Sequence, residues 1–407
     1  MSFSRDQIHN FAAGPSPLPE PVLEKAAKGL LNYDGTGIGV CELSHRGKEF
    51  KAIIEGAEAN LRKLLQVPDD YAVLFSQGGG TTQFSSVFLN LLAARRLKHA
   101  DETNYAPPTV DYVVTGSWSS KAYQEAVRLS IPPAPGAQPF AEPRIAATTK
   151  PAKFTTLPKA DEYDFSKDAA YVYYCENETI NGVEFPGPDS QSPYAFPFDR
   201  VPDGVPIVAD YSSSFLSRPI PQIERHAIIY AGAQKNLGPP GVTIVIVRKD
   251  LLVDTTEAMK LGGIPAVPIQ SEFKTLADNK SLYNTPPVFS IYVSALVLEY
   301  LLAERGGIAG IAEVNRAKGD ALYAALDEAE AKGKLRVVVQ EKDARSLMNI
   351  TFVIEGEGRE KEFLDGAEAR GFRQLKGHRS VGGIRASLYN AVTLESVKAL
   401  AEYIKAF

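Results

Sequence analysis

Residues 71–83 read YAVLFSQGGGTTQ, and this stretch decides the fold class. The apolar run Tyr71–Phe75 has the length and the composition of a β-strand that is covered on both faces. A glycine turn follows it, and apolar side chains then recur at helical spacing through Thr82–Leu97. A strand, a glycine turn and a helix in this order predict one unit of an α/β fold.

Further apolar runs along the chain have a similar residue composition. They are rich in valine, isoleucine and tyrosine, and they lack the polar alternation of a half-exposed strand. They are Val110–Thr115, Ala169–Tyr174, Pro206–Ala209, Ile228–Ala231 and Thr243–Val247. Their alternation with helical patterns predicts a mostly parallel sheet with helices on both sides. Residues 131–168 are rich in proline, alanine and threonine without a clear period, and they predict a long surface excursion.

The pattern of expected helices and strands changes after Ser290. The apolar stretch Ser290–Ala303 contains Glu299 and falls short of the ~18 apolar residues of a membrane-spanning helix, so we expect a buried helix. Glycines at 306, 307 and 310 then interrupt the chain. Beyond them we expect a helix at Ala312–Lys332, strands at Leu335–Val339 and Ile350–Ile354, and a helix at Thr393–Ala406. This pattern predicts a smaller α+β domain.

Composition and charge exclude several classes of protein. A chain of 407 residues predicts about two or three domains. The 44 Lys and Arg against 49 Asp and Glu give a formal charge of −5, so non-specific nucleic-acid binding is not expected. The amino terminus lacks the continuous apolar stretch of a signal peptide. Cys41 and Cys175 cannot build a disulfide framework, and we expect a cytoplasmic protein without a membrane contact or a metal site.

The glycine stretch Ser76–Gln83 is a candidate anion site. Glycine lets a ligand approach the backbone closely, and the following helix offers free N–H groups to a phosphate. The stretch is not a P-loop, because no Gly-Lys-Ser/Thr follows, and a tight turn without a ligand stays an alternative. Residues Gly35–Gly39 fail the dinucleotide spacing and predict a flexible loop.

Two charged residues stand at the ends of apolar runs. Asp210 ends the run Pro206–Ala209, where open α/β sheets place ligands, although a helix cap or a turn would also suit it. Lys235 lies between two apolar runs among small residues and rigid Pro/Gly turns. Desolvation there would lower the pKa of the amine and make it nucleophilic, whereas a solvated loop lysine is the ordinary alternative.

A phosphate cradle, a strand-end aspartate and a flanked lysine together are the parts that pyridoxal phosphate requires. The lysine forms a Schiff base, and the aspartate keeps the pyridine nitrogen protonated so that the ring withdraws electrons. Trp118, the only tryptophan, follows the run Val110–Thr115 and has a flat face that can stack on the ring. Core packing is the alternative for this side chain.

At this point the chain resembles the phosphoserine aminotransferases, which are fold-type I, class V enzymes. The resemblance spans nearly the whole chain, and its most specific parts are the Ser-His-Arg-Gly-Lys-Glu-Phe and Gly-His-Arg blocks. The matching stretches are Phe11–Leu18, Glu42–Phe50, Gln77–Phe84, Gly116–Ser119, Asn177–Gly182, Asn284–Pro287 and Gly377–Ser387.

The resemblance implies a role for each matching position. Lys235 would form the Schiff base and move protons, Asp210 would pair with the ring nitrogen, and Trp118 would stack on the ring. The further cofactor contacts would be Gly80, Thr81, Thr179, Gln234, Asn284 and Thr285, the last two reaching the cofactor phosphate of the other subunit. Thr82 stands where many relatives have glycine, and we expect it to serve as a cap of the helix.

The resemblance also implies a substrate and an assembly. The anionic groups of the substrates would meet His45, Arg46, His378, Arg379 and Arg385. Arginine binds carboxylate and phosphate with a bidentate fork, which suits a phosphorylated keto acid. The implied reaction converts 3-phosphohydroxypyruvate and L-glutamate to O-phospho-L-serine and 2-oxoglutarate in serine biosynthesis, and Arg385 would hold the α-carboxylate. The enzyme would be a homodimer with shared active sites.

The resemblance implies a domain division as well. A segment at 1–15 would pack with the small domain, residues 16–303 would form a large cofactor-binding domain with a mostly parallel seven-stranded sheet, and residues 304–407 would form the small α+β domain.

The sequence leaves two alternative functions open. An aminotransferase of plain keto acids and a non-catalytic relative of the fold stay open. A cysteine desulfurase is disfavoured because both cysteines precede Lys235, and an NAD-dependent dehydrogenase is disfavoured because the dinucleotide spacing is absent.

Overall fold

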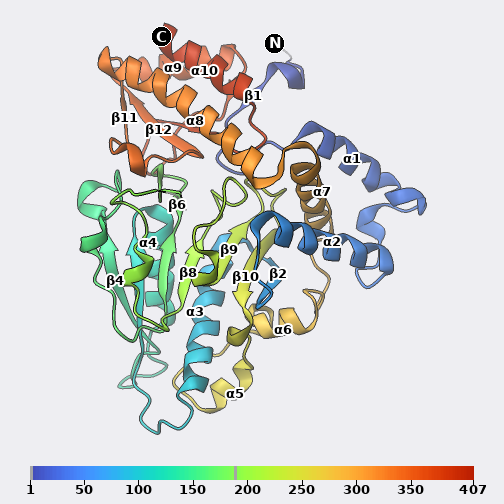
Figure 1. Cartoon of the computed structure of the whole chain (residues 1–407), viewed down its shortest axis with the longest axis vertical. Helices are drawn as coiled ribbons and strands as arrows, with labels where there is room; N and C mark the ends of the chain where they lie inside the picture. The colour runs from blue at the N-terminus through green and yellow to red at the C-terminus, as the bar shows by residue number, and fades with distance from the viewer. Residues whose placement is uncertain (1–2, 188–189) are drawn as a thin grey trace.

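The computed structural model describes residues 3–187 and 190–407, and it contains a large sheet below a smaller one (Figure 1). The strand order of the large sheet is β2-β10-β9-β8-β5-β3-β4. Only β10 runs antiparallel to its neighbours, so the prediction of a mostly parallel sheet is confirmed. The strands are β2 (Tyr71–Gln77), β3 (Thr109–Val114), β4 (Glu142–Thr148), β5 (Val172–Cys175), β8 (Ile207–Asp210), β9 (His226–Gly232) and β10 (Val242–Arg248).

The absence of polar alternation in the strands has a direct structural cause. Along β9, Ile229 and Ala231 face one apolar core, whereas Ile228 and Tyr230 face another, and all four are fully buried. The first core includes side chains of α1 (Glu20–Leu31), α2 (Lys48–Leu65) and α7 (Val288–Glu304). The second includes α3 (Gly79–Lys98), α4 (Ser117–Leu129), α5 (Thr255–Lys260) and α6 (Phe273–Asp278). Helices on both faces thus leave no side of the sheet to water.

Helix α7 is the buried helix that the apolar stretch predicts. Its residues from Ser290 to Leu298 are buried, its side chains belong to the first core, and its helical neighbours include α1 and α2. In the described residues, 3–187 and 190–407, no helix combines the length and the apolar character that crossing a bilayer requires.

The region 131–168, predicted to be a long surface excursion, contains strand β4 of the large sheet. Strand β4 is an edge strand that pairs with β3 alone. It contains Pro143, and its residues from Glu142 to Ile145 are at least partly exposed. An edge strand tolerates proline and polar residues because one side makes no ladder hydrogen bonds. Those residues concealed the strand in the sequence.

The smaller sheet is antiparallel and has the order β11-β12-β14. Its strands are β11 (Leu335–Val337), β12 (Asn349–Ile354) and β14 (Ile384–Ser387), and its helices are α8 (Gly307–Ala331), α9 (Arg359–Ala369) and α10 (Leu394–Ala406). Gly306 and Gly307 have positive φ and form the turn between α7 and α8, as their interruption of the helical pattern predicts. Helix α8 begins before the expected Ala312, so Gly310 lies inside it. Gly310 lies so close to Arg305 that a Cβ atom would stand 2.3 Å from its carbonyl oxygen. Close packing therefore explains this glycine.

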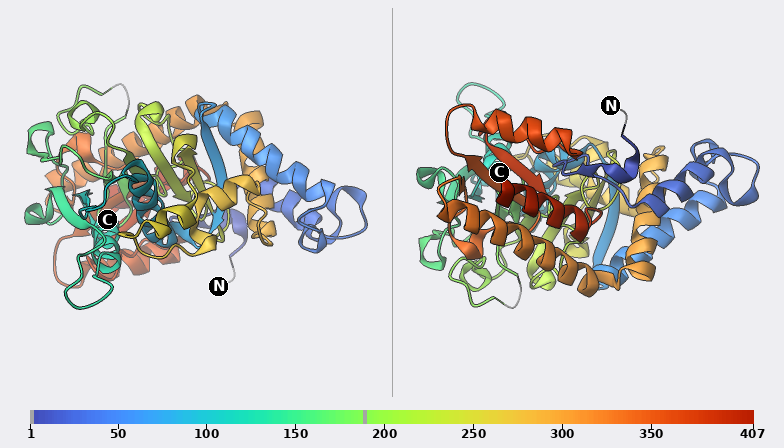
Figure 2. Two further views of the ribbon diagram at one scale, coloured as in Figure 1. Left: turned by 90° about the horizontal axis from the view of Figure 1, so that it is seen from below. Right: turned by 90° about the horizontal axis from the view of Figure 1, so that it is seen from above.

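The N-terminal residues reach the small sheet region across the molecule. Strand β1 (His9–Asn10) pairs in parallel with β13 (Phe372–Arg373), and Phe11 lies in the apolar core of the small region. Helices α1 and α2 project to one side of the molecule in each view (Figure 2). The division at residues 15 and 303 stays a prediction.

Candidate active site

Asp210 and Lys235 lie at the same edge of the large sheet. Asp210 is the last residue of β8, and Lys235 follows β9, the parallel neighbour of β8. The carboxyl ends of parallel strands are where α/β sheets bind ligands. The Nζ atom of Lys235 donates a hydrogen bond of 2.7 Å to Oγ1 of Thr179, which the sequence also singles out. The chain thus brings these three residues together.

The environment of Lys235 favours the neutral amine. The residue is 8% exposed, and burial lowers the pKa of the amine to about 8. The negative charge of Asp210 opposes this shift, and the positive charge of Arg385 acts in its direction. An amine with such a pKa is free as a nucleophile or proton acceptor near neutral pH far more often than an exposed lysine.

Asp210 is held by two donors that sequence analysis missed. Its Oδ1 accepts a hydrogen bond of 2.8 Å from the backbone N–H of Ser212, and its Oδ2 accepts one of 3.1 Å from the hydroxyl of Tyr230. Burial raises the pKa of Asp210, and the hydrogen bonds from Ser212 lower it. The Asp-x-Ser spacing of an Asx turn was the available signal for Ser212.

The glycine stretch packs onto Asp210. A Cβ atom on Gly80 would lie 3.4 Å from Oγ of Ser212 and 3.8 Å from Oδ2 of Asp210. Gly78 has φ +96°, and a Cβ atom there would lie 2.1 Å from Oγ1 of Thr82, so this position requires glycine. Thr81 is exposed in the first turn of α3. The turn therefore presents backbone N–H groups beside the aspartate.

The expectation that Thr82 caps α3 is wrong. Gly78 is the N-cap residue, and Thr82 lies one turn inside the helix, where its hydroxyl donates a hydrogen bond of 3.0 Å to the carbonyl oxygen of Gly78. A capping side chain accepts a hydrogen bond from a helical N–H group, whereas this hydroxyl donates one.

Trp118 lies at the first turn of α4 and is held there by Glu178. The two carboxylate oxygens of Glu178 accept hydrogen bonds from the backbone N–H groups of Trp118 at 2.9 Å and Ser119 at 2.8 Å. Glu178 was missed, although it belongs to the matching stretch Asn177–Gly182. The Nε1 atom of Trp118 is buried and has no partner among the described residues. Nζ of Lys121 stands 4.1 Å from the centre of the Trp118 ring.

The N-terminal segment covers the turn after β9 that contains Gln234 and Lys235. The carbonyl oxygen of Gln234 accepts a hydrogen bond of 3.0 Å from the N–H of Ser16, and Oγ of Ser16 donates to the carbonyl oxygen of Lys235. Gly14 has φ +123°, and a Cβ atom there would lie 3.4 Å from Cγ of Lys235. The matching stretch Phe11–Leu18 therefore lies against Gln234 and Lys235.

Arg385 also reaches this group of residues. Its Nη1 atom donates a hydrogen bond of 3.1 Å to the carbonyl oxygen of Thr179, so Lys235 and Arg385 contact the same residue. His378 is half-buried, and its Nδ1 atom lies 2.7 Å from Oγ of Ser380. Burial lowers the pKa of His378, and the charges of Arg385, Lys121 and Arg379 lower it further. Arg379 is exposed beside it.

The remaining predicted residues form a second group. Oγ1 of Thr285 lies 3.4 Å from Nδ1 of His45, and Arg46 and Asn284 are their exposed neighbours. The carbonyl oxygen of Thr285 accepts a hydrogen bond of 3.3 Å from Gln77 at the end of β2. No hydrogen bond or ion pair within the described ranges joins this group to Lys235 or Asp210.

Comparison with known proteins identifies the family. The family model described as aminotransferase class-V matches residues 8–400. A phosphoserine aminotransferase of Aromatoleum aromaticum is 45% identical over 402 residues, which cover 98% of each chain. The chain belongs to the phosphoserine aminotransferases of class V. This finding confirms the resemblance that the motifs indicate.

Solved structures of the family have the same fold. The phosphoserine aminotransferase from Bacillus circulans subsp. alkalophilus is 40% identical, with a TM-score of 0.83 over 98% of both chains. The PLP-bound phosphoserine aminotransferase from Trichomonas vaginalis is 35% identical, with a TM-score of 0.82 over 98% of this chain and 99% of that one. The expected fold, that of the fold-type I aminotransferases, is therefore confirmed.

Proposed function

We propose that this family member is a pyridoxal-phosphate-dependent enzyme that converts 3-phosphohydroxypyruvate and L-glutamate to O-phospho-L-serine and 2-oxoglutarate in serine biosynthesis. The observation that carries the proposal is the buried Lys235 amine beside buried Asp210, with Arg385 in contact with the same threonine as Lys235. The names and the cofactor of the relatives support it.

The residues at the sheet edge fit pyridoxal phosphate. Gly80 leaves space above Asp210, and Trp118 has a buried N–H without a protein partner in the described residues. Lys235 would hold the cofactor covalently, Asp210 would contact the ring nitrogen and Trp118 the ring face. The other contacts would come from Gly80, Thr81, Thr179 and Gln234. When bound, the cofactor supplies an electron sink for the amino-acid carbon.

The protein's own contribution to the chemistry centres on a proton at Nζ of Lys235. Burial keeps the pKa of this amine at about 8, so the amine can accept a proton from the substrate carbon and return it. Thr179 accepts the hydrogen bond of the amine and so fixes its direction. Asp210, desolvated and held by Ser212 and Tyr230, provides the negative charge on the opposite side of the site.

Cations select a substrate with two anionic groups. Arg385, which contacts Thr179 beside Lys235, would bind the α-carboxylate that both substrates share. His378 and Arg379 would bind the phosphate, or the side-chain carboxylate of glutamate, at the far end. A plain keto acid such as pyruvate carries no second anionic group for His378 and Arg379 to bind.

We also propose a homodimer with shared active sites in the cytoplasm. Among the described residues, no hydrogen bond or ion pair joins Lys235 to the group of His45, Arg46, Asn284 and Thr285, which supports a role of this group in the site of a partner subunit. There Asn284 and Thr285 would reach the cofactor phosphate, and His45 and Arg46 the substrate.

A direct assay tests the proposal. Purified protein with pyridoxal phosphate is given O-phosphoserine and 2-oxoglutarate, and glutamate formation is measured; L-serine and L-alanine replace O-phosphoserine in parallel. We expect turnover of O-phosphoserine to exceed that of either unphosphorylated amino acid at least about 100-fold, as one bidentate arginine contact of ~3 kcal/mol implies. Equal turnover of all three would refute the substrate assignment.

A further inference from the structure

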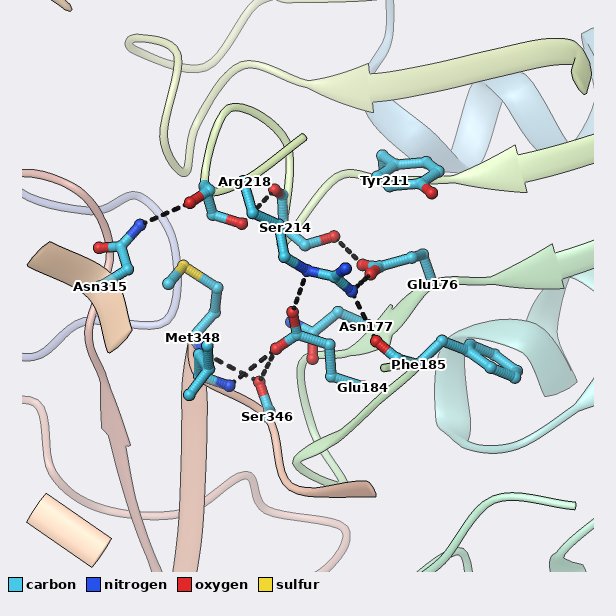
Figure 3. A network of polar contacts seen from close by, with 12 residues as sticks. Glu176, Asn177, Glu184, Phe185, Tyr211, Ser214, Arg218, Asn315, Ser346 and Met348 are labelled. Carbon is cyan, nitrogen blue, oxygen red and sulfur yellow. Dashed lines mark hydrogen bonds and ion pairs between the residues drawn. The ribbon is translucent and has the colours of Figure 1, made fainter. Parts of the chain in front are cut away.

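Arg218 lies between two buried carboxylates where the large and small sheets meet (Figure 3). Its Nε atom donates a hydrogen bond of 3.1 Å to Oε1 of Glu184. Its Nη2 atom donates to Oε1 of Glu176 and, at 2.5 Å, to the carbonyl oxygen of Phe185. Glu176 and Glu184 are 1% and 4% exposed. Burying three charged groups costs desolvation energy, so such a cluster is poor support for stability and instead fixes one geometry.

The second oxygen of Glu184 contacts the small sheet region. Oε2 accepts hydrogen bonds from the N–H of Leu347 at 2.7 Å and from the hydroxyl of Ser346 at 3.1 Å. The N–H of Ser346 in turn donates a hydrogen bond of 3.0 Å to the carbonyl oxygen of Gly182. Arg218 and Glu184 thereby tie residues 177–184 to the start of β12. These residues form a hairpin of β6 (Asn177–Glu178) and β7 (Val183–Glu184), which we call the connector hairpin.

The connector hairpin lies directly against β12. Gly182 has φ +77°, and a Cβ atom there would stand 2.7 Å from Oγ1 of Thr351 and 2.8 Å from the carbonyl oxygen of Asn349. The side chain of Asn177 donates a hydrogen bond of 2.9 Å to Oδ1 of Asn349, and Oγ1 of Thr351 donates one of 3.2 Å to the carbonyl oxygen of Asn181. A change in the position of the hairpin must therefore move β12 with it.

Strand β12 determines where Arg385 lies. It pairs with β14, and Thr351 stands opposite Arg385 in that ladder. Arg385 contacts the carbonyl oxygen of Thr179 in the connector hairpin, and Oγ1 of the same threonine accepts the hydrogen bond of Lys235. One hairpin thus contacts both the catalytic amine and the arginine that would hold the substrate carboxylate.

We propose that Arg218 and Glu184 are positioning residues that set the place of Arg385 relative to Lys235 through the connector hairpin and β12. Neither residue touches substrate or cofactor. The proposal rests on the assignment of Arg385 to the α-carboxylate under the proposed function. Its consequence is a specific kinetic signature, because both substrates carry that carboxylate.

Glu184→Gln tests the pair with little change in shape. The amide NH2 group of glutamine must face either Nε of Arg218 or the N–H of Leu347, and both are donors, so one hydrogen bond is lost. Misplacement of Arg385 should raise the KM of O-phosphoserine and of 2-oxoglutarate about tenfold each, with kcat changed less than about threefold. Amide hydrogen exchange of residues 345–354 should accelerate in the same variant.

Asp111→Asn is the matched control. Asp111 is another fully buried carboxylate next to an arginine, with Nε of Arg144 at 3.0 Å, but it lies on β3 at the side of the sheet that bears β4. This variant should lose thermal stability while both KM values and the exchange of 345–354 stay unchanged. Arg218→Lys, which keeps the positive charge but loses the forked contact with Glu176 and Glu184, should raise both KM values about threefold and serves if Glu184→Gln does not fold.

Two results would overturn the positioning role. One is unchanged KM values in a folded Glu184→Gln enzyme, and the other is unaltered exchange in residues 345–354. Failure of the proposed function has a different signature, since the unmodified holoenzyme itself would then not turn over O-phosphoserine. In that case the exchange measurement alone decides whether the pair controls β12.

Discussion

The two groups of predicted site residues differ in how the chain holds them. Lys235, Asp210 and Thr179 are buried and hydrogen-bonded, and residues from both ends of the chain contact this group. Around His45 and Thr285 the side chains are mostly exposed, and one contact of 3.4 Å joins them. The first group is joined by contacts within one chain. Under the proposed dimer, the second group would act in the site of another subunit.

The sharpest test of the first group replaces its amine. Lys235→Ala should retain the cofactor by its other contacts and lose about 10³-fold or more of kcat, because the proton carrier is gone. Activity with O-phosphoserine and the absorbance of the purified protein measure the two effects.

Borohydride reduction of the unmodified enzyme should mark Lys235 and leave Lys318, which is also fully buried, unlabelled. Near-normal turnover by Lys235→Ala would remove the central assignment.

Mixing subunits tests whether the second group serves a partner. Lys235→Ala and Arg46→Ala proteins are unfolded and refolded together and assayed at an O-phosphoserine concentration low enough that each variant alone should be nearly inactive. If Arg46 acts across the interface, mixed dimers have one intact site, and about a quarter of the normal activity should return under random two-fold pairing. If Arg46 acts within its own chain, the mixture stays as inactive as its parts. Mixing each variant with itself is the control.

The phosphate role of the arginines predicts a change in selectivity. Arg46→Ala and Arg379→Ala should each weaken binding of O-phosphoserine by about 1.5–3 kcal/mol, the worth of a charge-assisted contact, and weaken L-serine much less. Dissociation constants from absorbance titration of the holoenzyme measure the ratio. Equal losses for the two ligands would assign these arginines a general electrostatic role instead.

The buried amine also predicts how stability depends on pH in the cofactor-free protein. The pKa of Lys235 is about 8 when folded and near 10.5 when unfolded, so the unfolded chain binds more protons between these values. Raising the pH through this window should therefore stabilise the folded state by up to ~3 kcal/mol, with no such dependence below it. Urea unfolding of the protein and of Lys235→Met measures the difference. Burial also lowers the pKa of Lys318, to about 7, but that residue is present in both proteins and cancels.

Much of the fold follows from the sequence because buried strands are apolar throughout. Every apolar run expected as a strand in the first three-quarters of the chain lies in the large sheet. The element missed there, β4, is an edge strand with Pro143 and exposed positions. In the small region, helix α9 and strand β14 were not predicted, and α9 carries only Phe363 and Ala367 as buried residues. Elements with little buried surface leave little periodicity to detect.

The sequence predicts the site best at Lys235 and Asp210, whose residue types match one chemical role each. Lys235 and Asp210 stand at strand ends, so their proximity follows from topology alone. Glu178 and Arg218 could not be assigned supporting roles from the sequence, because their partners are distant along the chain. Ser119 lies 59 positions from Glu178, and Glu184 lies 34 positions from Arg218. Such pairings depend on the completed fold, which local patterns in a sequence do not encode.

The pairing of β1 with β13 has a consequence for biosynthesis. The ribosome makes residues 9 and 10 long before their strand partner at 372 and 373. Ser16 can contact Lys235 as soon as that residue has emerged, whereas His9 and Asn10 still lack their strand partner at that time. A nascent chain can therefore assemble its large sheet early, but the pairing of β1 with β13 must wait until residue 373 has been made.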